Sequence, residues 1–225
     1  MTGGPSKISP VREVYARHKL KAIASRWDAR ADSWDSALQD PASCFNEDDA
    51  YRRFARTVHR LIAKRRAFCA RHGVIDAGCG TGLVLAEISS AFAWGMGIDI
   101  SSRMIRLARA KHIPKTKFIV GDCFDLASLC PKGGLVLSRG VLLSHYGRQQ
   151  GQAMLDAARA VLVRGGFLVV DFLNEAARAR YRHAPENKTW FQSAEIQAMA
   201  EQAGFSRITI SGRPERRARL LIAHA

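Results

Sequence analysis

Hydrophobic and polar residues follow two different patterns along the chain. In residues 11–71 apolar side chains recur at helical spacing and basic side chains occupy another face, so we expect two or three helices there. The apolar positions are Tyr51, Phe54, Val58, Leu61 and Ile62, and the basic ones are Arg52, Arg56, Arg60 and Lys64. Residues 40–43, Asp-Pro-Ala-Ser, interrupt this pattern and are expected to form a loop, because Pro41 is disfavoured in a helix interior.

From residue 72 onward, short runs rich in Val, Ile and Leu alternate with helical patterns. We expect strands at 73–77, 95–99, 117–120, 134–138 and 166–172, and helices at 81–90, 101–112 and 148–163. Ser101 is a credible N-cap, and Gly165–Gly166 is expected to mark the end of the long third helix. This alternation predicts an α/β fold with βαβ units and a doubly wound, mostly parallel sheet.

The last part of the chain departs from that alternation. A helix is expected at 193–203, beginning at Ser193 and stopped by Gly204, and is followed by strands at 205–210 and 217–224. The six residues between these two strands are too few for a helical crossover, so the strands should pair antiparallel. The pattern as a whole predicts a seven-stranded sheet with one antiparallel strand near the C-terminus and an N-terminal helical extension.

Three segments are expected: a disordered tail at 1–10, a helical cap segment at 11–71 and one α/β domain at 72–225. Residues 174–191 exceed an ordinary strand-to-helix loop, and either a substrate lid or a plain solvated helix fits them. Their basic and aromatic side chains are Arg178, Arg180, Tyr181, Arg182, His183 and Trp190.

Composition bears on membrane contact, cellular compartment and the state of the cysteines. The chain has 225 residues, 47% of them hydrophobic, without the run of apolar residues that a membrane-spanning helix needs, so no membrane contact is expected. Residues 1–10 lack the apolar stretch of a secretory signal, which favours the cytoplasm. The five cysteines, Cys44, Cys69, Cys79, Cys123 and Cys130, show no metal-ligand spacing, so reduced thiols and no metal site are expected.

The net charge is strongly positive. The chain has 35 Lys and Arg against 20 Asp and Glu, a formal charge of +15, and the excess is spread over its whole length. Such a balance raises the expectation of a nucleic acid or an anionic small molecule as partner, although diffuse arginine enrichment has other causes.

A glycine-rich loop follows the first expected strand. Residues 76–82 read Asp-Ala-Gly-Cys-Gly-Thr-Gly, at a place where backbone N–H groups and a helix dipole can face a polar ligand. A dinucleotide loop of the form G-x-G-x-x-G/A would need a small residue where Leu83 stands. The spacing G-x-G-x-G therefore favours an amino-acid-bearing nucleoside over a pyrophosphate.

This loop resembles the first motif of the class I S-adenosylmethionine-dependent methyltransferases, an acidic residue followed by x-G-x-G-x-G. The resemblance implies S-adenosyl-L-methionine as cofactor and S-adenosyl-L-homocysteine as product, with Asp76 near the cofactor's amino group and Gly78, Gly80 and Gly82 around its methionine part. Asp99 then takes the ribose hydroxyls, which suits a carboxylate. Ile100 would flank the adenine, Asp122 would accept from its exocyclic amine, and the Cys123 N–H would face a ring nitrogen.

The resemblance covers residues 72–225, and a segment at residues 27–35 extends it toward the N-terminus. Residues 163–168, Val-Arg-Gly-Gly-Phe-Leu, resemble the family's turn before strand five, with Arg164 in place of the usual proline. Residues 27–35, Trp-Asp-Ala-Arg-Ala-Asp-Ser-Trp-Asp, resemble its pre-domain segment, with Trp34 replacing tyrosine and expected to close over the methionine end.

The methyl acceptor should lie beyond the fourth strand, at residues 138–147. Ser138 is expected on the cofactor side. Three residues are catalytic candidates: His145, which could titrate near neutral pH and act as base or orient the acceptor; Arg139, which could bind a carboxylate or phosphate; and Tyr146. The turn resembles that of small-molecule methyltransferases, glycine N-methyltransferase among them. Those enzymes have asparagine where Val141 stands, which puts glycine as the substrate in doubt.

The sequence thus favours methyl transfer to an oxygen or nitrogen of a small molecule. The first alternative is an RNA methyltransferase using the basic surface, but residues 138–147 carry no [D/N]-P-P-[F/Y/W] and no Pro-Cys nucleophile. The second is a cofactor-binding partner protein without activity. The sequence does not fix the acceptor or the oligomeric state.

Overall fold

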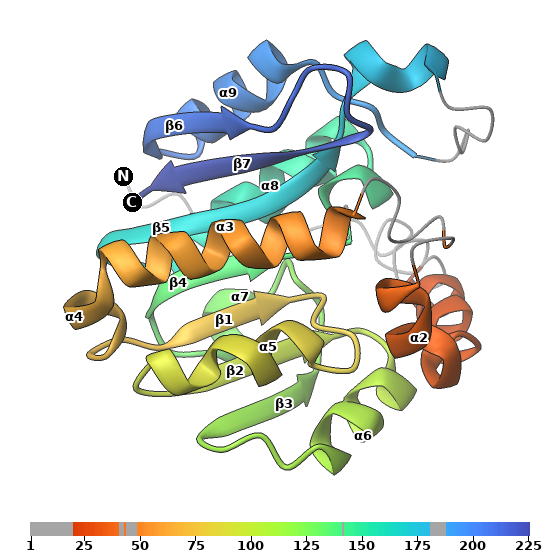
Figure 1. Cartoon of the computed structure of the whole chain (residues 1–225), viewed down its shortest axis with the longest axis vertical. Coiled ribbons are helices and arrows are strands. Elements are labelled where there is room, and N and C mark those ends of the chain that lie inside the picture. Colours follow the sequence, from red (N-terminus) through yellow and green to blue (C-terminus); the bar gives the residue numbers. More distant parts are fainter. Residues whose placement is uncertain (1–19, 41–42, 44–48, 141, 181–187) are drawn as a thin grey trace, which may run out of the picture.

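In the part of the chain that the structure describes, seven strands form a single sheet in the order β3-β2-β1-β4-β5-β7-β6 (Figure 1). The computed structural model describes residues 20–40, 43, 49–140, 142–180 and 188–225. The strands are β1 Val74–Ala77, β2 Gly95–Asp99, β3 Thr116–Val120, β4 Gly133–Ser138, β5 Leu162–Leu173, β6 Ser206–Ser211 and β7 Ala218–His224. Every pairing is parallel except the two made by β7, so the expected sheet with one antiparallel strand is confirmed.

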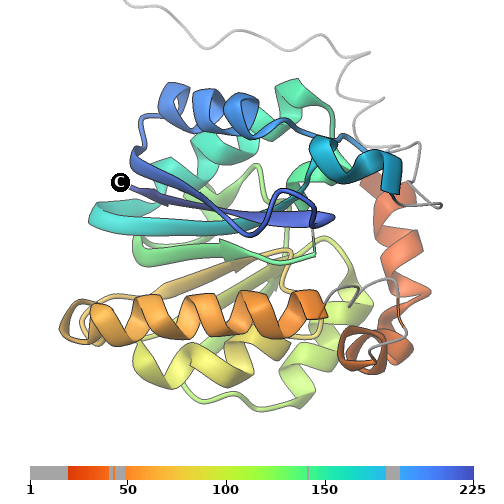
Figure 2. The ribbon, with the colours of Figure 1, turned by 45° about the horizontal axis from the view of Figure 1, so that its top comes forward.

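Helices cover both faces of the sheet (Figure 2). The helices are α2 Trp34–Gln39, α3 Ala50–Lys64, α4 Arg66–Cys69, α5 Leu83–Ile88, α6 Ser102–Ala110, α7 Leu126–Leu129, α8 Arg148–Ala160 and α9 Ser193–Gln202. Residues 20–28 are also helical, and together with α2 they lie at the carboxyl ends of the parallel strands (Figure 1). None of the helices in the described part of the chain is long and apolar enough to cross a membrane.

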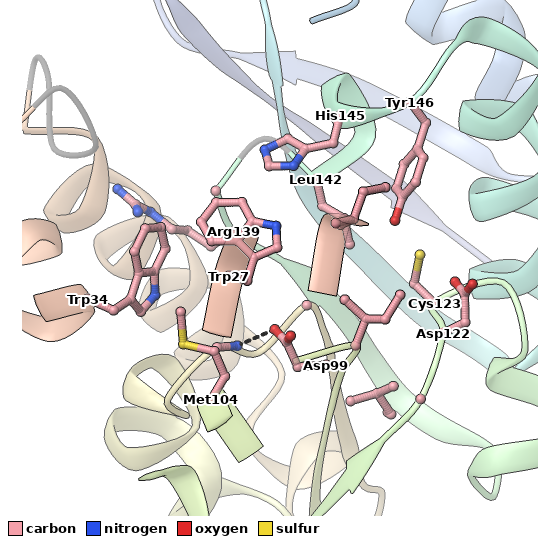
Figure 3. Close-up of a pocket in the computed structure, with 17 residues that line it drawn as sticks. Trp27, Trp34, Asp99, Met104, Asp122, Cys123, Arg139, Leu142, His145 and Tyr146 are labelled. Atoms are coloured by element: carbon pink, nitrogen blue, oxygen red, sulfur yellow. Dashed lines mark hydrogen bonds between the residues drawn. The ribbon is translucent and has the colours of Figure 1, made fainter. Parts of the chain in front are cut away.

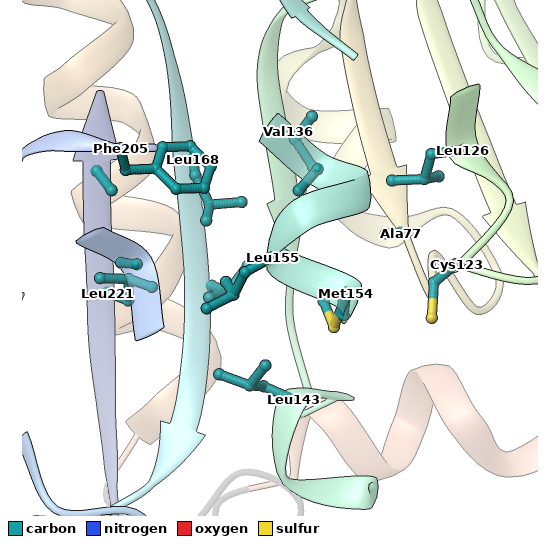
Figure 4. Close-up of a cluster of buried hydrophobic side chains, with 14 of the residues drawn as sticks. Ala77, Cys123, Leu126, Val136, Leu143, Met154, Leu155, Leu168, Phe205 and Leu221 are labelled. Carbon is teal, nitrogen blue, oxygen red and sulfur yellow. The ribbon is translucent and has the colours of Figure 1, made fainter. Parts of the chain in front are cut away.

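Two hydrophobic clusters fix the sheet, one on each face. Alternate residues of a strand point to opposite faces, so Ile75 of β1 packs beneath α7, α8 and α9 while Val74 packs beneath α3, α5 and α6. Figure 4 shows part of the first cluster, which includes Leu155 of α8 and, next to each other, Leu168 of β5 and Phe205. Because both faces are buried, the carboxyl ends of the strands form a rigid edge.

The junction before β5 differs from expectation. Gly165–Gly166 does not end the long helix: α8 ends at Ala160, and β5 already begins at Leu162. Leu162 is buried and pairs with Gly133, so burial starts the strand before the glycines are reached. The register then shifts next to the glycine pair, where Gly165 has a φ of 77°. Ser101 is confirmed as the N-cap of α6, since its Oγ accepts from the Met104 N–H at 3.0 Å.

The N-terminal segment has more helical pieces than expected. Residues 20–28, α2, α3 and α4 precede the sheet, because Arg65 with a φ of −127° separates α4 from α3. The four basic residues at 52, 56, 60 and 64 are exposed along α3, as the pattern indicated. The expected tail at 1–10, part of the loop at 40–43 and residues 181–187 of the expected lid lie outside the described residues.

Candidate functional site

A cavity opens at the carboxyl ends of β1, β2, β3 and β4 (Figure 3). The space inside it, open solvent included, is about 640 Å³. Ten residues expected from the sequence line it: Trp34, Gly78, Gly80, Asp99, Ile100, Asp122, Cys123, Arg139, His145 and Tyr146. The side chains expected to hold a cofactor and those expected to handle an acceptor therefore meet in one space.

The glycine loop forms the floor of this cavity. Gly78 and Gly80 have φ values of 74° and 53°, and a Cβ on Gly80 would lie 2.8 Å from the indole nitrogen of Trp34. Both residues line the cavity, so ligand atoms can approach their backbone closely. Gly82 instead precedes α5 and does not line the cavity, and a Cβ there would lie 2.8 Å from the ring of Phe118. The third glycine of the motif therefore serves packing.

Asp99 ends β2 with its carboxylate at the cavity. One oxygen accepts from the Gly80 N–H at 2.8 Å, drawn as a dashed line in Figure 3, and the other accepts from the Ser101 N–H at 2.8 Å. Burial raises the pKa of Asp99 above its usual value despite these bonds. Asp76 is 2% exposed behind the loop, and burial together with the charge of Asp99 raises its pKa well above the usual range. A cationic ligand would offset the cost of keeping both carboxylates charged.

A second polar edge follows β3. Asp122 lines the cavity and accepts from the Phe124 N–H at 3.1 Å, and burial raises the pKa of its carboxyl. The neighbouring Cys123 is 6% exposed, and burial raises the pKa of its thiol, so the thiol stays protonated. In Figure 3 this pair lies beside Tyr146, across the cavity from Trp34.

Two tryptophans cover the cavity from the N-terminal segment. Trp27 meets Trp34 edge to face at 5.2 Å and stacks on His145 at 5.4 Å with an interplanar angle of 13°. In Figure 3 Trp27 lies between Trp34 and Leu142, with His145 above it. Both indoles line the cavity, so this segment forms part of its wall.

Three aspartates of the same segment bond to the α/β domain. Asp28 accepts from the Ser101 hydroxyl at 2.5 Å and from the Arg103 N–H at 3.0 Å, at the start of α6. Asp32 pairs with Arg103 as well. Asp35 accepts from the Thr81 hydroxyl in the glycine loop and from Lys111 at 2.7 Å. The two tryptophans are thus positioned by bonds to the loop and helix that form the floor.

His145 ends the short 3-10 helix η4 Leu142–His145. Burial lowers its pKa to about 3, with the positive charges of Lys188, Arg26 and Arg30 acting in the same direction. The imidazole is therefore neutral at physiological pH, and the expectation that it titrates near pH 7 is wrong, because a dry site with cationic neighbours disfavours its charged form. Tyr146 stays protonated too, since burial raises the pKa of its phenol.

Arg139 lies at the cavity wall, 9% exposed. Its guanidinium carbon is 5.4 Å from the centre of the Tyr51 ring. Burial lowers its pKa, and the charge of Asp171 acts in the opposite direction. The arginine is thus held between an aromatic ring and a carboxylate of β5 at one side of the cavity.

Three expected cofactor residues do not line the cavity: Asp76, Gly82 and Ser138. Ser138 is 1% exposed, and its Oγ has no hydrogen-bond partner within the described parts of the chain. The cavity is also lined by side chains that the sequence analysis did not name as site residues, among them Trp27 and Met104. Trp27 belonged to the recognised segment at 27–35, whereas a lone methionine on a helix gives no signal.

A doubly wound sheet with a cavity over the glycine loop at the carboxyl ends of its strands is typical of α/β proteins that bind nucleotide-like cofactors. Residues 74–166 match the sequence model of a methyltransferase domain. Over 105 residues the chain is 30% identical to a dTDP-3-amino-3,6-dideoxy-alpha-D-glucopyranose N,N-dimethyltransferase from Streptomyces fradiae, a match that covers 44% of this chain and 39% of that protein.

Solved structures share the fold. A magnesium protoporphyrin IX methyltransferase from Synechocystis PCC 6803 with bound SAH has a TM-score of 0.69 at 21% identity, covering 91% of this chain and 98% of that one. An amino pentose methyltransferase from Micromonospora echinaspora has a TM-score of 0.68 at 18% identity, covering 85% and 95%. The chain thus has a methyltransferase domain at residues 74–166, and its fold is shared by S-adenosylmethionine-dependent methyltransferases.

Proposed function

We propose that the protein transfers the methyl group of S-adenosylmethionine to an oxygen or nitrogen of a small molecule that carries a carboxylate or phosphate. One observation supports this most directly: a single cavity is lined both by Asp99 and Asp122 and by Arg139, His145 and Tyr146. Cofactor and acceptor would thus meet inside the molecule rather than on an open surface.

The residues at the cofactor end fit this cofactor. Burial raises the pKa values of Asp76 and Asp99, which means that their charged forms are costly in the empty site. S-adenosylmethionine is a cation, so its binding would stabilise these charged carboxylates. Each oxygen of Asp99 accepts one backbone N–H and has a second lone pair for a ribose hydroxyl. The backbone of Gly78 and Gly80 provides the close approach that the methionine part needs.

At the acceptor end, the main role of the protein is to position the acceptor. The bound cofactor supplies an electrophilic methyl group on a sulfonium, and in-line transfer requires an acceptor atom held at that carbon. His145, with a pKa of about 3, can accept a hydrogen bond from an O–H or N–H group of the substrate that is to be methylated. It is too weak a base to remove the proton of that group near pH 7. The phenol of Tyr146 stays protonated beside Cys123, and Trp27 stacks on His145, so both rings form walls against which the methyl acceptor can be held.

The structure favours a small molecule over RNA as acceptor. Trp27 and Trp34 form part of the wall of a cavity, whereas an RNA methyltransferase needs an open basic groove that leads a strand to the methyl group. The basic row at 52, 56, 60 and 64 lies along the solvent face of α3, and two of its members, Arg52 and Arg56, pair with Asp49.

Transfer of labelled methyl groups tests the proposal. The protein is incubated with methyl-labelled S-adenosylmethionine and either a metabolite extract below about 1 kDa or total RNA, and label is followed into each pool. We expect label in the small-molecule pool, abolished in Asp99→Ala and retained in the exposed control Asp125→Ala. Label in RNA alone would identify an RNA methyltransferase, and cofactor binding without label in either pool would indicate a partner protein without activity.

A further inference from the structure

A second cavity lies between the first part of α3 and the strands β5 and β7, whose places Figure 1 shows. The space inside it, open solvent included, is about 680 Å³. Among the described residues, none lines both this cavity and the one over the glycine loop. It is therefore a separate place at which a ligand can bind, and we call it the α3 cavity.

One side of α3 supplies three guanidinium groups to the α3 cavity. Arg53, Arg56 and Arg60 all line it, at a spacing of three and four residues that places side chains on the same side of a helix. Arg56 and Arg60 also belong to the basic row that the sequence pattern predicts along this helix. Part of that row thus borders a cavity in addition to facing the solvent.

Carboxylates offset little of this positive charge. Among the described lining residues the one acidic side chain is Asp171, which is 4% exposed and accepts from the Gly140 N–H at 3.2 Å. Asp49 lies outside the lining and pairs with Arg56 at 3.3 Å and with Arg52 at 3.8 Å, and every side chain in these two pairs is at least 43% exposed. Exposed pairs of this kind contribute little stability, so Arg56 can exchange its partner for an anion in the cavity.

The remaining wall of the α3 cavity is partly apolar. Phe54 is 1% exposed and Leu220 is partly buried, and both belong to the hydrophobic cluster between α3 and the sheet. Ala50 and Ala218 line the cavity as well, and their short side chains occupy little of its space. The cavity therefore combines guanidinium groups with an apolar surface, which suits an organic anion.

Hydrogen bonds fix the turn that borders the α3 cavity at Ser211 and Gly212. The guanidinium of Arg219 donates to the Gly212 carbonyl at 3.1 Å and to the Ile210 carbonyl at 3.3 Å, on either side of Ser211. A third bond, to the Ser193 hydroxyl at 2.6 Å, connects the same guanidinium to the start of α9. This wall is thus held in place without a ligand, which lowers the ordering cost of binding.

We propose that the α3 cavity binds a small organic phosphate, with its phosphate group on the guanidinium groups of α3 and its apolar part against Phe54 and Leu220. The guanidinium fork matches the geometry of phosphate oxygens, and converging cations favour a group with two negative charges over a group with one. The inference goes beyond the proposed function and does not depend on it, because the α3 cavity shares no described lining residue with the cavity over the glycine loop.

Calorimetry with phenyl phosphate tests the site. At pH 8 the phosphate group of this probe carries about two negative charges, whereas benzoate has the same ring and a single charge. We expect phenyl phosphate to bind and benzoate to bind about threefold or more weakly. Arg56→Gln and Arg60→Gln should each weaken the binding of phenyl phosphate about threefold to tenfold.

Each variant has a matched control on the same helix. Arg52→Gln removes the other arginine that pairs with Asp49, and Lys64→Gln removes a charge one turn beyond Arg60, but neither Arg52 nor Lys64 lines the cavity. Both controls should bind phenyl phosphate as tightly as the wild type. Ala218→Leu adds bulk to the wall without a change of charge and should also weaken binding. Thermal unfolding of every variant shows whether it has folded.

Amide signals in proton–nitrogen correlation spectra locate the ligand. Thr57, Ser211 and Gly212 line the α3 cavity, whereas Gly78 and Gly121 line the cavity over the glycine loop. Phenyl phosphate should shift the first three signals and leave the other two in place. The proposal is overturned by shifts confined to Gly78 and Gly121, by equal affinity in the variants and their controls, or by benzoate that binds as tightly as phenyl phosphate.

Discussion

Replacing Asp99 by asparagine tests the cofactor end of the site most sharply. The substitution preserves the shape of the side chain but removes its charge and one of its two acceptor atoms. In the wild type, those atoms accept from Gly80 and Ser101, at 2.8 Å each, and in the proposed complex they also accept the ribose hydroxyls. Asparagine therefore offers a ribose hydroxyl at most one uncharged acceptor.

The expected loss can be estimated from these bonds. A hydrogen bond to a charged acceptor contributes about 1.5–3 kcal/mol, and losing one corresponds to a Kd for SAH that is about 10- to 150-fold weaker. In the apo protein one N–H donor loses its acceptor, at a cost of about 1–3 kcal/mol, while the cost of burying the charge disappears. We therefore expect Tm of the apo protein to fall by no more than about 10 °C.

Titration calorimetry with SAH, together with thermal unfolding in the presence and absence of SAH, checks both numbers. Asp125→Asn is the matched control, because it makes the same change on an exposed carboxylate that does not line the cavity. We expect SAH to raise Tm in the wild type and control and much less in Asp99→Asn. Unchanged SAH affinity in Asp99→Asn would show that the carboxylate does not hold the ribose.

Three further predictions concern Trp27 in the cavity wall, His145 at the acceptor end and Gly82 in the fold. Trp27→Ala removes a stacked wall and should weaken SAH binding about 2- to 12-fold by calorimetry. In an NMR titration from pH 5 to 8, the His145 ring signals should not shift, whereas those of an exposed histidine should. Gly82→Ala, at a φ of 78° and with its Cβ 2.8 Å from Phe118, should lower the free energy of unfolding in urea by about 1–3 kcal/mol.

Most of the sheet could be predicted because short apolar runs with a clear interruption on either side mark most of its strands. The strand at 95–99 was predicted to the residue. Errors arose where local pattern and burial disagree: Gly165–Gly166 looks like a helix end, but Leu162 is already paired and buried before it. The one-turn helix α7, four residues long, is too short to show any periodicity.

The two ends of the site differ in how far the sequence reveals them. The proposed cofactor end depends on residues at or just after strand ends, such as Asp99, which ends β2, and Gly80, three residues after β1, so contiguous motifs identify it. The acceptor end depends on contacts between segments far apart in the chain, such as the stack of Trp27 on His145. The sequence predicts His145 in the site, but it predicts a pKa near neutrality that differs from the value of about 3 in the structure. Burial and the charges of Lys188, Arg26 and Arg30 lower this pKa, and neither can be read from the local sequence.

The N-terminal segment couples the two ends of the cavity. Asp35 bonds to Thr81 of the glycine loop, and Asp28 bonds to Ser101, whose N–H donates to Asp99. The same segment carries Trp27, which contacts His145 at the acceptor end. A cofactor bound against the glycine loop and Asp99 should therefore also favour the position of Trp27 over the acceptor end. The reason is that Asp28 and Asp35 connect the segment that carries Trp27 to the glycine loop and to Ser101. Acceptor affinity should accordingly be higher with cofactor bound, and by linkage the acceptor should raise cofactor affinity by the same factor.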